Sequence, residues 1–372
     1  MSSVISKFYL TTDRELSKEE RMMTQKLKPH TVILEITSQC NMQCAHCRAV
    51  CKNKQGEELS LREHITLADE LVKLGPKHLF LSGGEALLSP HWKTLAHYYH
   101  HRGVRIILLS NGLLIPKCID DIVKSPISQI AISIDGLKKT HEMIRGVRES
   151  FEIALSSLDL IKQKGQGRII TSVITTVSKW NIDELEDLYQ VLSSRGIILW
   201  QIQRPSPHGQ IDRNFMLDST DISRLYQFIH AKRELRKNNP SINVMGVTAA
   251  CNVTPFYKEN TRSIGNDYTG CPAGLFCLGI EANGNVKGCL TQSSEFIEGN
   301  IRERPLSTIW NDPHNFAYNR FFYEDKIKGS CQSCNFVESD DHYNQSYCLH
   351  LCPLDWHSMK VATNLARPNA SA

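Results

Sequence analysis

Three cysteines within a span of eight residues constrain this chain more than any other feature. Cys40, Cys44 and Cys47 are spaced Cys-x3-Cys-x2-Cys and directly follow the apolar run 31–37. Three thiolates this close together can bind one metal centre. A four-iron, four-sulfur cluster needs four ligands, so three cysteines leave one iron open to a small molecule. The spacing alone also permits a zinc site with a fourth ligand nearby, or a disulfide with a spare thiol.

The composition points away from membranes, export and nucleic acid. The first ten residues lack the apolar core of a signal peptide, and no stretch approaches the ~18 apolar residues of a membrane span. A net charge of +4 is too small to indicate a nucleic-acid partner. We therefore expect a cytoplasmic protein, and its 13 cysteines then indicate metal ligands more than disulfides.

Short apolar runs alternate with helical patterns from residue 31 onward. The expected strands cover residues 31–37, 78–82, 104–109, 129–134, 169–176 and 197–203. Continuous apolar runs are typical of parallel strands that are buried on both faces. Capping boxes at 60–63 and 181–184 predict two of the helix starts. Six β/α units predict an α/β fold, and because a closed barrel needs eight, we expect an open, partial (β/α)6 barrel.

The pattern changes after the sixth expected strand, and the predicted domains follow that change. They are an N-terminal extension (1–30), the partial barrel (31–240), a loop-rich, cysteine-dense domain (241–355) and a C-terminal tail (356–372). The second cysteine group consists of Cys271, Cys277, Cys289, Cys331, Cys334, Cys348 and Cys352. Asn283-Gly284 within this region predicts a β-hairpin turn. A zinc ribbon is one interpretation of such cysteine pairs.

Each of three further expected strands ends in a distinctive turn. The motifs are Gly83-Gly84-Glu85, Ser110-Asn111-Gly112 and Ser133-Ile134-Asp135-Gly136. In parallel α/β sheets, ligands gather at the carboxyl ends of the strands. Paired glycines allow close backbone approach, and the following carboxylate can hold a cation such as an amino group. Four such turns on successive strands, counting the cysteine loop, predict one binding site.

Together these motifs make residues from about 31 to 210 resemble a radical S-adenosylmethionine (SAM) enzyme. The segment 141–146 (His-Glu-Met-Ile-Arg-Gly) adds to the resemblance. It implies an iron–sulfur cluster on Cys40, Cys44 and Cys47, whose open iron binds SAM and whose electron releases a 5′-deoxyadenosyl radical. The implied SAM contacts are Gly83, Gly84 and Glu85 for the methionyl ammonium group, and Ser110, Ser133 and Arg145 for the ribose or carboxylate. His46 stands where that family usually has an aromatic residue near adenine.

The second cysteine group resembles the SPASM domain, an extension of radical SAM enzymes that act on peptides and proteins. The resemblance implies a first auxiliary iron–sulfur cluster on Cys271, Cys277, Cys289 and Cys352, and a second one on Cys331, Cys334 and Cys348. Thirteen residues separate Cys334 from Cys348 where the usual pattern has five, and no cysteine follows Cys352. Asp340 stands at the expected ligand position and resembles an aspartate ligand in the SPASM enzyme of pyrroloquinoline-quinone biosynthesis. Asp341, His342 or no protein ligand are the alternatives.

The two resemblances together favour a peptide maturase. Such an enzyme would take electrons from a donor such as flavodoxin or ferredoxin and would modify a ribosomally made precursor peptide. Oxidative crosslinking, with a cyclophane-type carbon–carbon bond as the first hypothesis, would use the auxiliary clusters as electron acceptors. The alternatives are a sulfatase-maturating (formylglycine-forming) enzyme, an enzyme of haem or quinone-cofactor biosynthesis, and a zinc-binding interaction module. The sequence identifies no catalytic base.

Overall fold

A single mixed sheet of ten strands organises the chain, in the order β10-β9-β8-β1-β2-β3-β4-β5-β6-β7. The structure, a computed structural model, describes residues 22, 24–47, 56–205, 213–238, 246–249, 272–292 and 294–320. The strands are β1 (Thr31–Glu35), β2 (His78–Ser82), β3 (Arg105–Ser110), β4 (Ile127–Ser133), β5 (Ile170–Thr176), β6 (Leu199–Gln203), β7 (Gly246–Ala249), β8 (Cys277–Ile280), β9 (Asn285–Lys287) and β10 (Gly299–Asn300).

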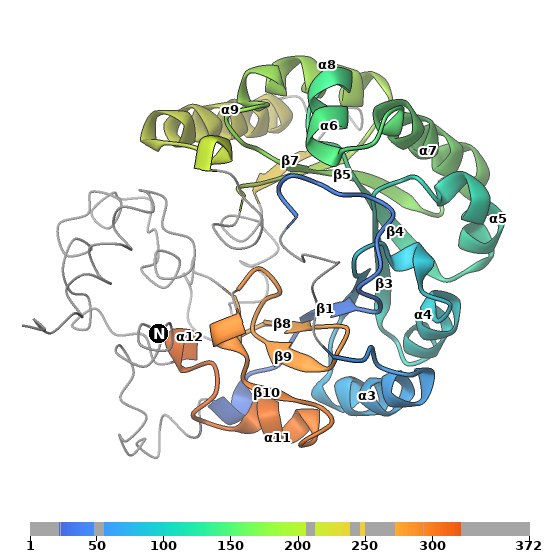
Figure 1. Cartoon of the computed structure of the whole chain (residues 1–372), viewed down its shortest axis with the longest axis vertical. Helices are drawn as coiled ribbons and strands as arrows, with labels where there is room; N and C mark the ends of the chain where they lie inside the picture. The colour runs from blue at the N-terminus through green and yellow to red at the C-terminus, as the bar shows by residue number, and fades with distance from the viewer. Residues whose placement is uncertain are drawn as a thin grey trace, which may run out of the picture.

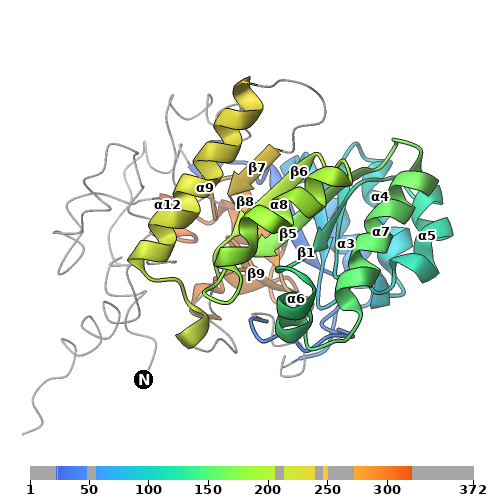
Figure 2. The same ribbon diagram turned by 90° about the horizontal axis from the view of Figure 1, so that it is seen from above.

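Helices cover the outer face of this curved sheet (Figure 1). They are α3 (Leu61–Leu74), α4 (Trp92–His100), α5 (Ile115–Lys124), α6 (Lys138–Arg145), α7 (Ser150–Gly165), α8 (Leu185–Ser194), α9 (Ser219–Asn238), α11 (Leu306–Asn311) and α12 (Ala317–Arg320). The helices α8 and α9 lie side by side next to β7 (Figure 2), and Lys232 of α9 pairs with Glu186 of α8 at 2.7 Å. None of the helices in the described ranges is both long and apolar enough to span a bilayer.

The α/β partial-barrel prediction is confirmed. All six expected strands are present and pair in parallel, in chain order, from β1 to β6. A seventh parallel strand, β7, pairs with β6 after residue 240, where we had predicted the next domain to begin. Its four residues are too short a run for the apolar pattern to identify, because a pattern needs several alternations or a longer apolar stretch.

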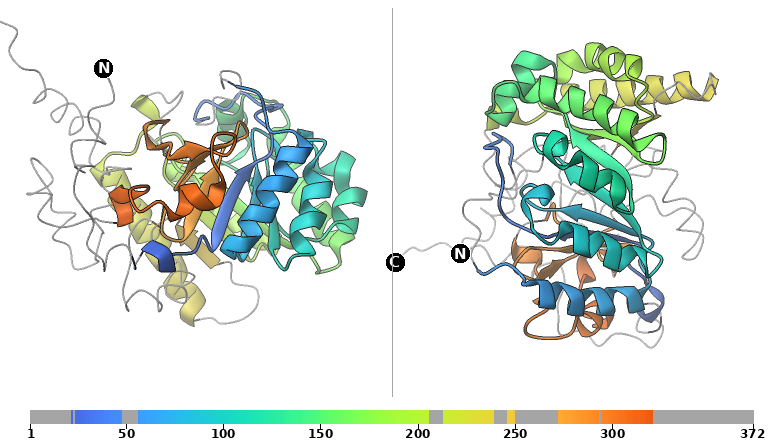
Figure 3. Two further views of the ribbon diagram at one scale, coloured as in Figure 1. Left: turned by 90° about the horizontal axis from the view of Figure 1, so that it is seen from below. Right: turned by 90° about the vertical axis from the view of Figure 1, so that its right-hand side faces the viewer.

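The cysteine-dense region continues the same sheet instead of standing apart from it. The strand β8 runs parallel to β1, with Thr31 opposite Cys277 and Leu34 opposite Ile280. The antiparallel pair β8–β9 is the predicted hairpin, and Gly284 in its turn has a φ of 90° that favours glycine. Figure 3 shows this hairpin beside β1. The β1 strand is therefore covered on both edges.

One predicted capping box forms and the other does not. Ser60 accepts from the Glu63 N–H at 3.3 Å and its own N–H donates to the Glu63 carboxylate at 2.8 Å, so α3 begins as expected. Asn181 makes no cap. Its side-chain amide donates instead to the Asp135 and Thr176 carbonyls at 3.1 and 2.9 Å. The cap does not form because Asn181 Oδ1, the atom that would accept from the helix N–H, already accepts from the Ser178 N–H at 2.7 Å.

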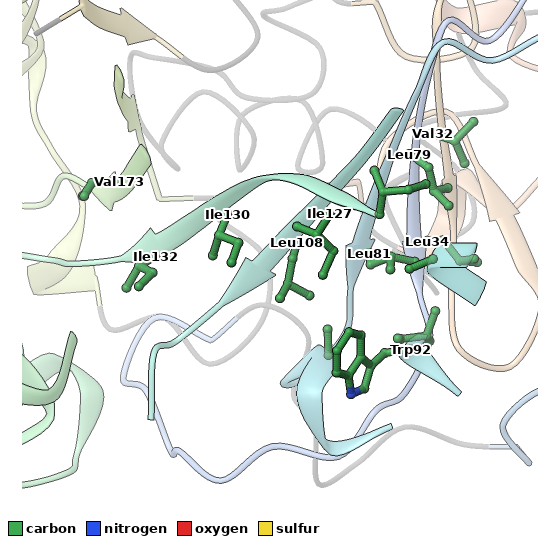
Figure 4. Packing of buried hydrophobic residues seen from close by; sticks show 14 of the residues in the cluster. Val32, Leu34, Leu79, Leu81, Trp92, Leu108, Ile127, Ile130, Ile132 and Val173 are labelled. Atoms are coloured by element: carbon green, nitrogen blue, oxygen red, sulfur yellow. The ribbon is translucent and has the colours of Figure 1, made fainter. Parts of the chain in front are cut away.

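The core lies between the sheet and its outer helices. Val32 and Leu34 of β1 stand opposite Leu79 and Leu81 of β2, and all four are fully buried (Figure 4). Trp92 at the start of α4 packs into the same cluster. Full burial stabilises each such side chain by roughly 1.5–3 kcal/mol relative to exposure. The core therefore fixes the strand register that brings the turns at the carboxyl ends together.

Candidate functional site

The cysteine loop leaves the carboxyl end of β1 and is held by α6. Cys40, Cys44 and Cys47 form no disulfide and are half-buried. The Ala45 N–H donates to the Ile144 carbonyl of α6 at 2.8 Å, and the side chain of Met42, within the loop, is buried. This hydrogen bond ties the loop to the end of α6.

The two glycines after β2 pack against the backbone that leads into this loop. The Gly84 N–H donates to the Thr37 carbonyl at 2.9 Å, and the Glu85 N–H donates to the Gln39 carbonyl at 2.8 Å. A Cβ on Gly83 would overlap the Thr37 carbonyl oxygen, and a Cβ on Gly84 would overlap that of Gln39. The predicted close backbone approach is present, and its partner is the segment just before Cys40.

The Glu85 side chain lies inside the protein and joins two strand ends. Its carboxylate accepts from the Leu87 N–H, the Ser110 hydroxyl and the Asn111 N–H at 3.2, 3.0 and 2.8 Å. Burial raises the pKa of Glu85, although these three donors oppose the shift. The Ser110 hydroxyl thus positions Glu85 in this structure, and the SAM contacts of Ser110 and Glu85 stay predictions.

Asn111 is a site residue that the sequence reasoning left without a role. Its side-chain amide donates to Asn41 Oδ1 at 2.7 Å and lies 4.0 Å from Cys40 Sγ. Its side-chain oxygen, Oδ1, accepts from the Leu113 N–H at 3.0 Å. The sequence feature that could have identified Asn111 is its position in the Ser110-Asn111-Gly112 turn. Asn111 ties the end of β3 to the cysteine loop.

Arg145 and Asp135 form a buried ion pair beside the loop. An Arg145 terminal nitrogen lies 2.6 Å from Asp135 Oδ2, and the other lies 3.6 Å from Cys44 Sγ. Asp135 is fully buried and Oδ1 accepts from the Thr176 N–H at 2.8 Å. Burial raises its pKa, but the charge of Arg145, the ring of His46 and the Thr176 N–H together outweigh burial, so the pKa of Asp135 lies below its ordinary value. Asp135 was part of a predicted turn and had no assigned role.

His46 contacts both this ion pair and the 3-10 turn η3 (Arg213–Phe215). Its Nε2 lies 3.5 Å from Asp135 Oδ2, and its ring stacks on Phe215 with a 5.6 Å centroid distance and a 2° interplanar angle. Burial lowers the pKa of His46 to about 4, so the ring is neutral at pH 7. The neutral ring therefore packs the cysteine loop against Phe215.

The remaining predicted site residues are distributed as follows. Ser133 is half-buried at the end of β4, next in the sheet to the strand that carries Ser110. Cys277 begins β8, and Cys289 follows β9. A Cβ on Gly279 would lie 3.0 Å from the Cys289 carbonyl carbon, so the backbones that carry these two cysteines run in contact. The other predicted auxiliary ligands, Cys271, Cys331, Cys334, Asp340, Cys348 and Cys352, lie outside the described residues.

The donor set of the cysteine loop fits an iron–sulfur cluster. Three thiols that form no disulfide share one loop, and N–H donors of Arg145 and Asn111 are directed at the sulfur atoms of Cys44 and Cys40. Such donors suit the partial negative charge of metal-bound thiolate sulfur. Among the described residues, no group of three or more His, Cys, Asp and Glu side chains is arranged to hold a single metal ion.

Two family models match the chain. Residues 34–192 match the radical SAM superfamily, and residues 271–335 match SPASM, an iron–sulfur cluster-binding domain. The first match contains the cysteine loop and all three strand-end turns. The second begins at Cys271 and ends just after Cys334. Both resemblances inferred from the motifs are therefore confirmed, together with the cofactors that they imply.

Three similar proteins illustrate the range of the match. AdoMet-dependent heme synthase of Methanosarcina barkeri is 26% identical over 330 residues, which cover 85% of this chain and 91% of that protein. The sporulation killing factor maturation protein SkfB of Bacillus subtilis is 25% identical over 285 residues, or 76% of this chain and 64% of SkfB. Streptococcus suis SuiB bound to the precursor peptide SuiA superposes with a TM-score of 0.63 at 16% identity, over 86% of this chain and 76% of SuiB. This last likeness is one of fold.

Proposed function

The chain is a radical SAM enzyme with a C-terminal SPASM domain, and we propose that it matures a ribosomally made precursor peptide by oxidative crosslinking. SkfB, a maturation protein, supports the proposal through sequence similarity. SuiB, which shares the fold, binds a precursor peptide. A cyclophane-type carbon–carbon bond is the first hypothesis for the product.

One structural observation carries the proposal, namely the pairing of β8 with β1. The strand that leads to the cluster loop and the strand that begins at Cys277 are neighbours in one sheet, with Thr31 opposite Cys277. Bond formation after hydrogen abstraction leaves one electron to remove. An acceptor fixed to the same rigid sheet suits that task better than one on a separate, movable domain. Flavodoxin or ferredoxin stays our prediction for the donor of the first electron.

Different residues of the chain would bind the cluster, fix the loop backbone and exclude water. Cys40, Cys44 and Cys47 would hold the cluster, and Gly83 and Gly84 keep the loop backbone in place through their contacts with residues 37–39. The cluster with SAM supplies the electron and the hydrogen-abstracting radical when both are bound. The stacked rings of His46 and Phe215 would help to keep water from the radical.

A second candidate function follows from the haem synthase similarity. The match to that relative covers 85% of this chain. We therefore keep a porphyrin as the competing substrate class. Formylglycine formation on a sulfatase-type peptide is the third.

Product masses separate these candidates. Purified, cluster-loaded protein would be incubated with SAM, a reductant and either a candidate precursor peptide or an iron porphyrin. Loss of a pair of hydrogens from the peptide supports crosslinking, whereas the mass change of cysteine to formylglycine supports the third candidate. An unchanged peptide together with a modified porphyrin would overturn the maturase proposal. A small peptide encoded next to this reading frame is the first substrate to test.

A further inference from the structure

The position of Arg145 suggests a role beyond the binding of SAM. Arg145 is the last residue of α6, and Gly146 ends that helix with a φ of 68°. The side chain is only 10% exposed and turns back toward the cysteine loop. One terminal nitrogen lies 3.6 Å from Cys44 Sγ, and the other lies 2.6 Å from Asp135. The guanidinium is thus fixed between a predicted cluster ligand and a carboxylate.

We propose that the Arg145–Asp135 pair sets the reduction potential of the cluster held by Cys40, Cys44 and Cys47. In this arrangement Arg145 is a positive charge on a ligand sulfur, and Asp135 reduces the effect of that charge. The proposal rests on the cluster assignment and is independent of the peptide substrate. It gives Arg145 and Asp135 a role in electron transfer and leaves the chemistry of SAM to the cofactor.

Electrostatics gives each member of the pair an opposite effect. Reduction adds one electron to the cluster, so a nearby positive charge stabilises the reduced form and raises the potential. Hydrogen bonds to the cysteine sulfurs and the net charge around the cluster are established determinants of the potential. A negative charge stabilises the oxidised form and lowers the potential. Asp135 is fully buried, so solvent screens its charge poorly.

The geometry keeps the two charges in place. Thr176 donates its N–H to Asp135 Oδ1, so the carboxylate cannot swing away from Arg145 without losing that bond. The Asp135 N–H donates to His141 Nδ1 at 3.0 Å, and His141 is fully buried. Arginine suits this position because its planar fork contacts a carboxylate and a sulfur at once, which a lysine ammonium does less well.

Two substitutions of the full-length, cluster-loaded enzyme test the proposal. Arg145→Gln removes the positive charge, and Asp135→Asn leaves that charge without its counterion. Each protein would be titrated potentiometrically without SAM, and the reduced cluster would be followed by electron paramagnetic resonance. The triple variant Cys40→Ala/Cys44→Ala/Cys47→Ala supplies the spectrum of the auxiliary clusters alone for subtraction. Arg148→Gln is the matched control, since Arg148 is exposed and lies three residues further along the chain.

The expected result is a pair of shifts with opposite signs. The midpoint potential falls in Arg145→Gln, rises in Asp135→Asn and is unchanged in Arg148→Gln. Arg145→Lys keeps the positive charge, so its midpoint potential should lie between those of wild type and Arg145→Gln. If Arg145 and Asp135 only held the cysteine loop in place, both substitutions would loosen the loop and would shift the midpoint potential in the same direction. Shifts of the same sign, or no shift in either variant, would overturn the proposal. If Arg145→Gln fails to retain iron, the direction of the Asp135→Asn shift decides alone.

Discussion

Arg302, in the segment that matches SPASM, forms a two-pronged ion pair with Glu63, in the segment that matches the radical SAM superfamily. The Arg302 Nε lies 2.5 Å from Glu63 Oε1, and a terminal nitrogen lies 3.3 Å from Oε2. The same guanidinium donates to the Glu57 and Glu58 carbonyls at 2.9 and 3.1 Å. The Glu58 carboxylate accepts from the Ser38 N–H at 2.7 Å, two residues before Cys40. A continuous set of contacts therefore links the SPASM segment to the cluster loop.

Replacement of Arg302 by Ala should weaken this link. Exposed ion pairs contribute little, but Arg302 also satisfies backbone carbonyls. We expect the free energy of unfolding to fall by about 1–2 kcal/mol, as measured by urea denaturation. Arg302→Lys should recover only part of the loss because an ammonium lacks the fork. Arg62→Ala is the control, since Arg62 is exposed on α3, the helix that carries Glu63. It should change the free energy of unfolding by less than about 0.5 kcal/mol. Equal effects of Arg302→Ala and Arg62→Ala would contradict this role.

The substitution Gly84→Ala should disrupt the cluster loop. The added methyl group would overlap the Gln39 carbonyl, and two backbones would have to separate. We expect the iron and sulfide content after reconstitution to fall several-fold, with far-ultraviolet circular dichroism largely retained. Gly165→Ala in α7 is the matched control, because its new Cβ would lie at an ordinary 3.4 Å from Ile169. Full iron loading in Gly84→Ala would show that the close approach is dispensable.

Glu298 should make stability depend on pH. Burial raises the pKa of this carboxyl from 4.5 to about 7. An acid whose folded pKa is raised destabilises the fold progressively as pH rises from its unfolded pKa to its folded pKa. Between pH 4.5 and 7, Glu298→Gln should therefore become steadily more stable than wild type, by at most ~3 kcal/mol. Gln keeps an acceptor for the Phe316 N–H, which now donates to Glu298 at 2.9 Å.

Thermal midpoints of both proteins, equally loaded with iron and measured at half-unit pH steps, would test this dependence. Glu303→Gln removes the same charge from an exposed position and serves as the control. A difference between Glu298→Gln and wild type that is flat across this range would refute the assignment.

Sequence patterns predicted the barrel because long apolar strands carry their own signal. The expected strand 78–82 matches β2 at both ends, and the other five differ by at most two residues at either end. The Asn181 cap failed since Asn181 Oδ1 accepts from the Ser178 N–H instead, while the amide nitrogen donates to the Asp135 and Thr176 carbonyls. The strand β7 was missed because pairing with β6 defines it, and local pattern does not.

The sequence predicted which turns form the site, but it did not predict most of the contacts between their side chains. The glycines of Gly83-Gly84-Glu85 were expected to allow close approach, but only the fold identifies the backbone of residues 37–39 as their partner. Ser110 was identified from its motif, whereas its bond to Glu85 depends on how β2 and β3 align. The ion pair of Asp135 with Arg145 likewise depends on the fold, because Arg145 lies on the following helix, α6.

The central claim is that Cys40, Cys44 and Cys47 hold the cluster that cleaves SAM. The most direct measurement is the yield of 5′-deoxyadenosine from SAM and a strong reductant, by anaerobically reconstituted wild type and by the triple Cys→Ala variant. We expect brown, iron- and sulfide-containing wild-type protein that produces 5′-deoxyadenosine, and no product above background from the variant. A colourless wild type that holds zinc, or production of 5′-deoxyadenosine that survives in the triple variant, would contradict the account.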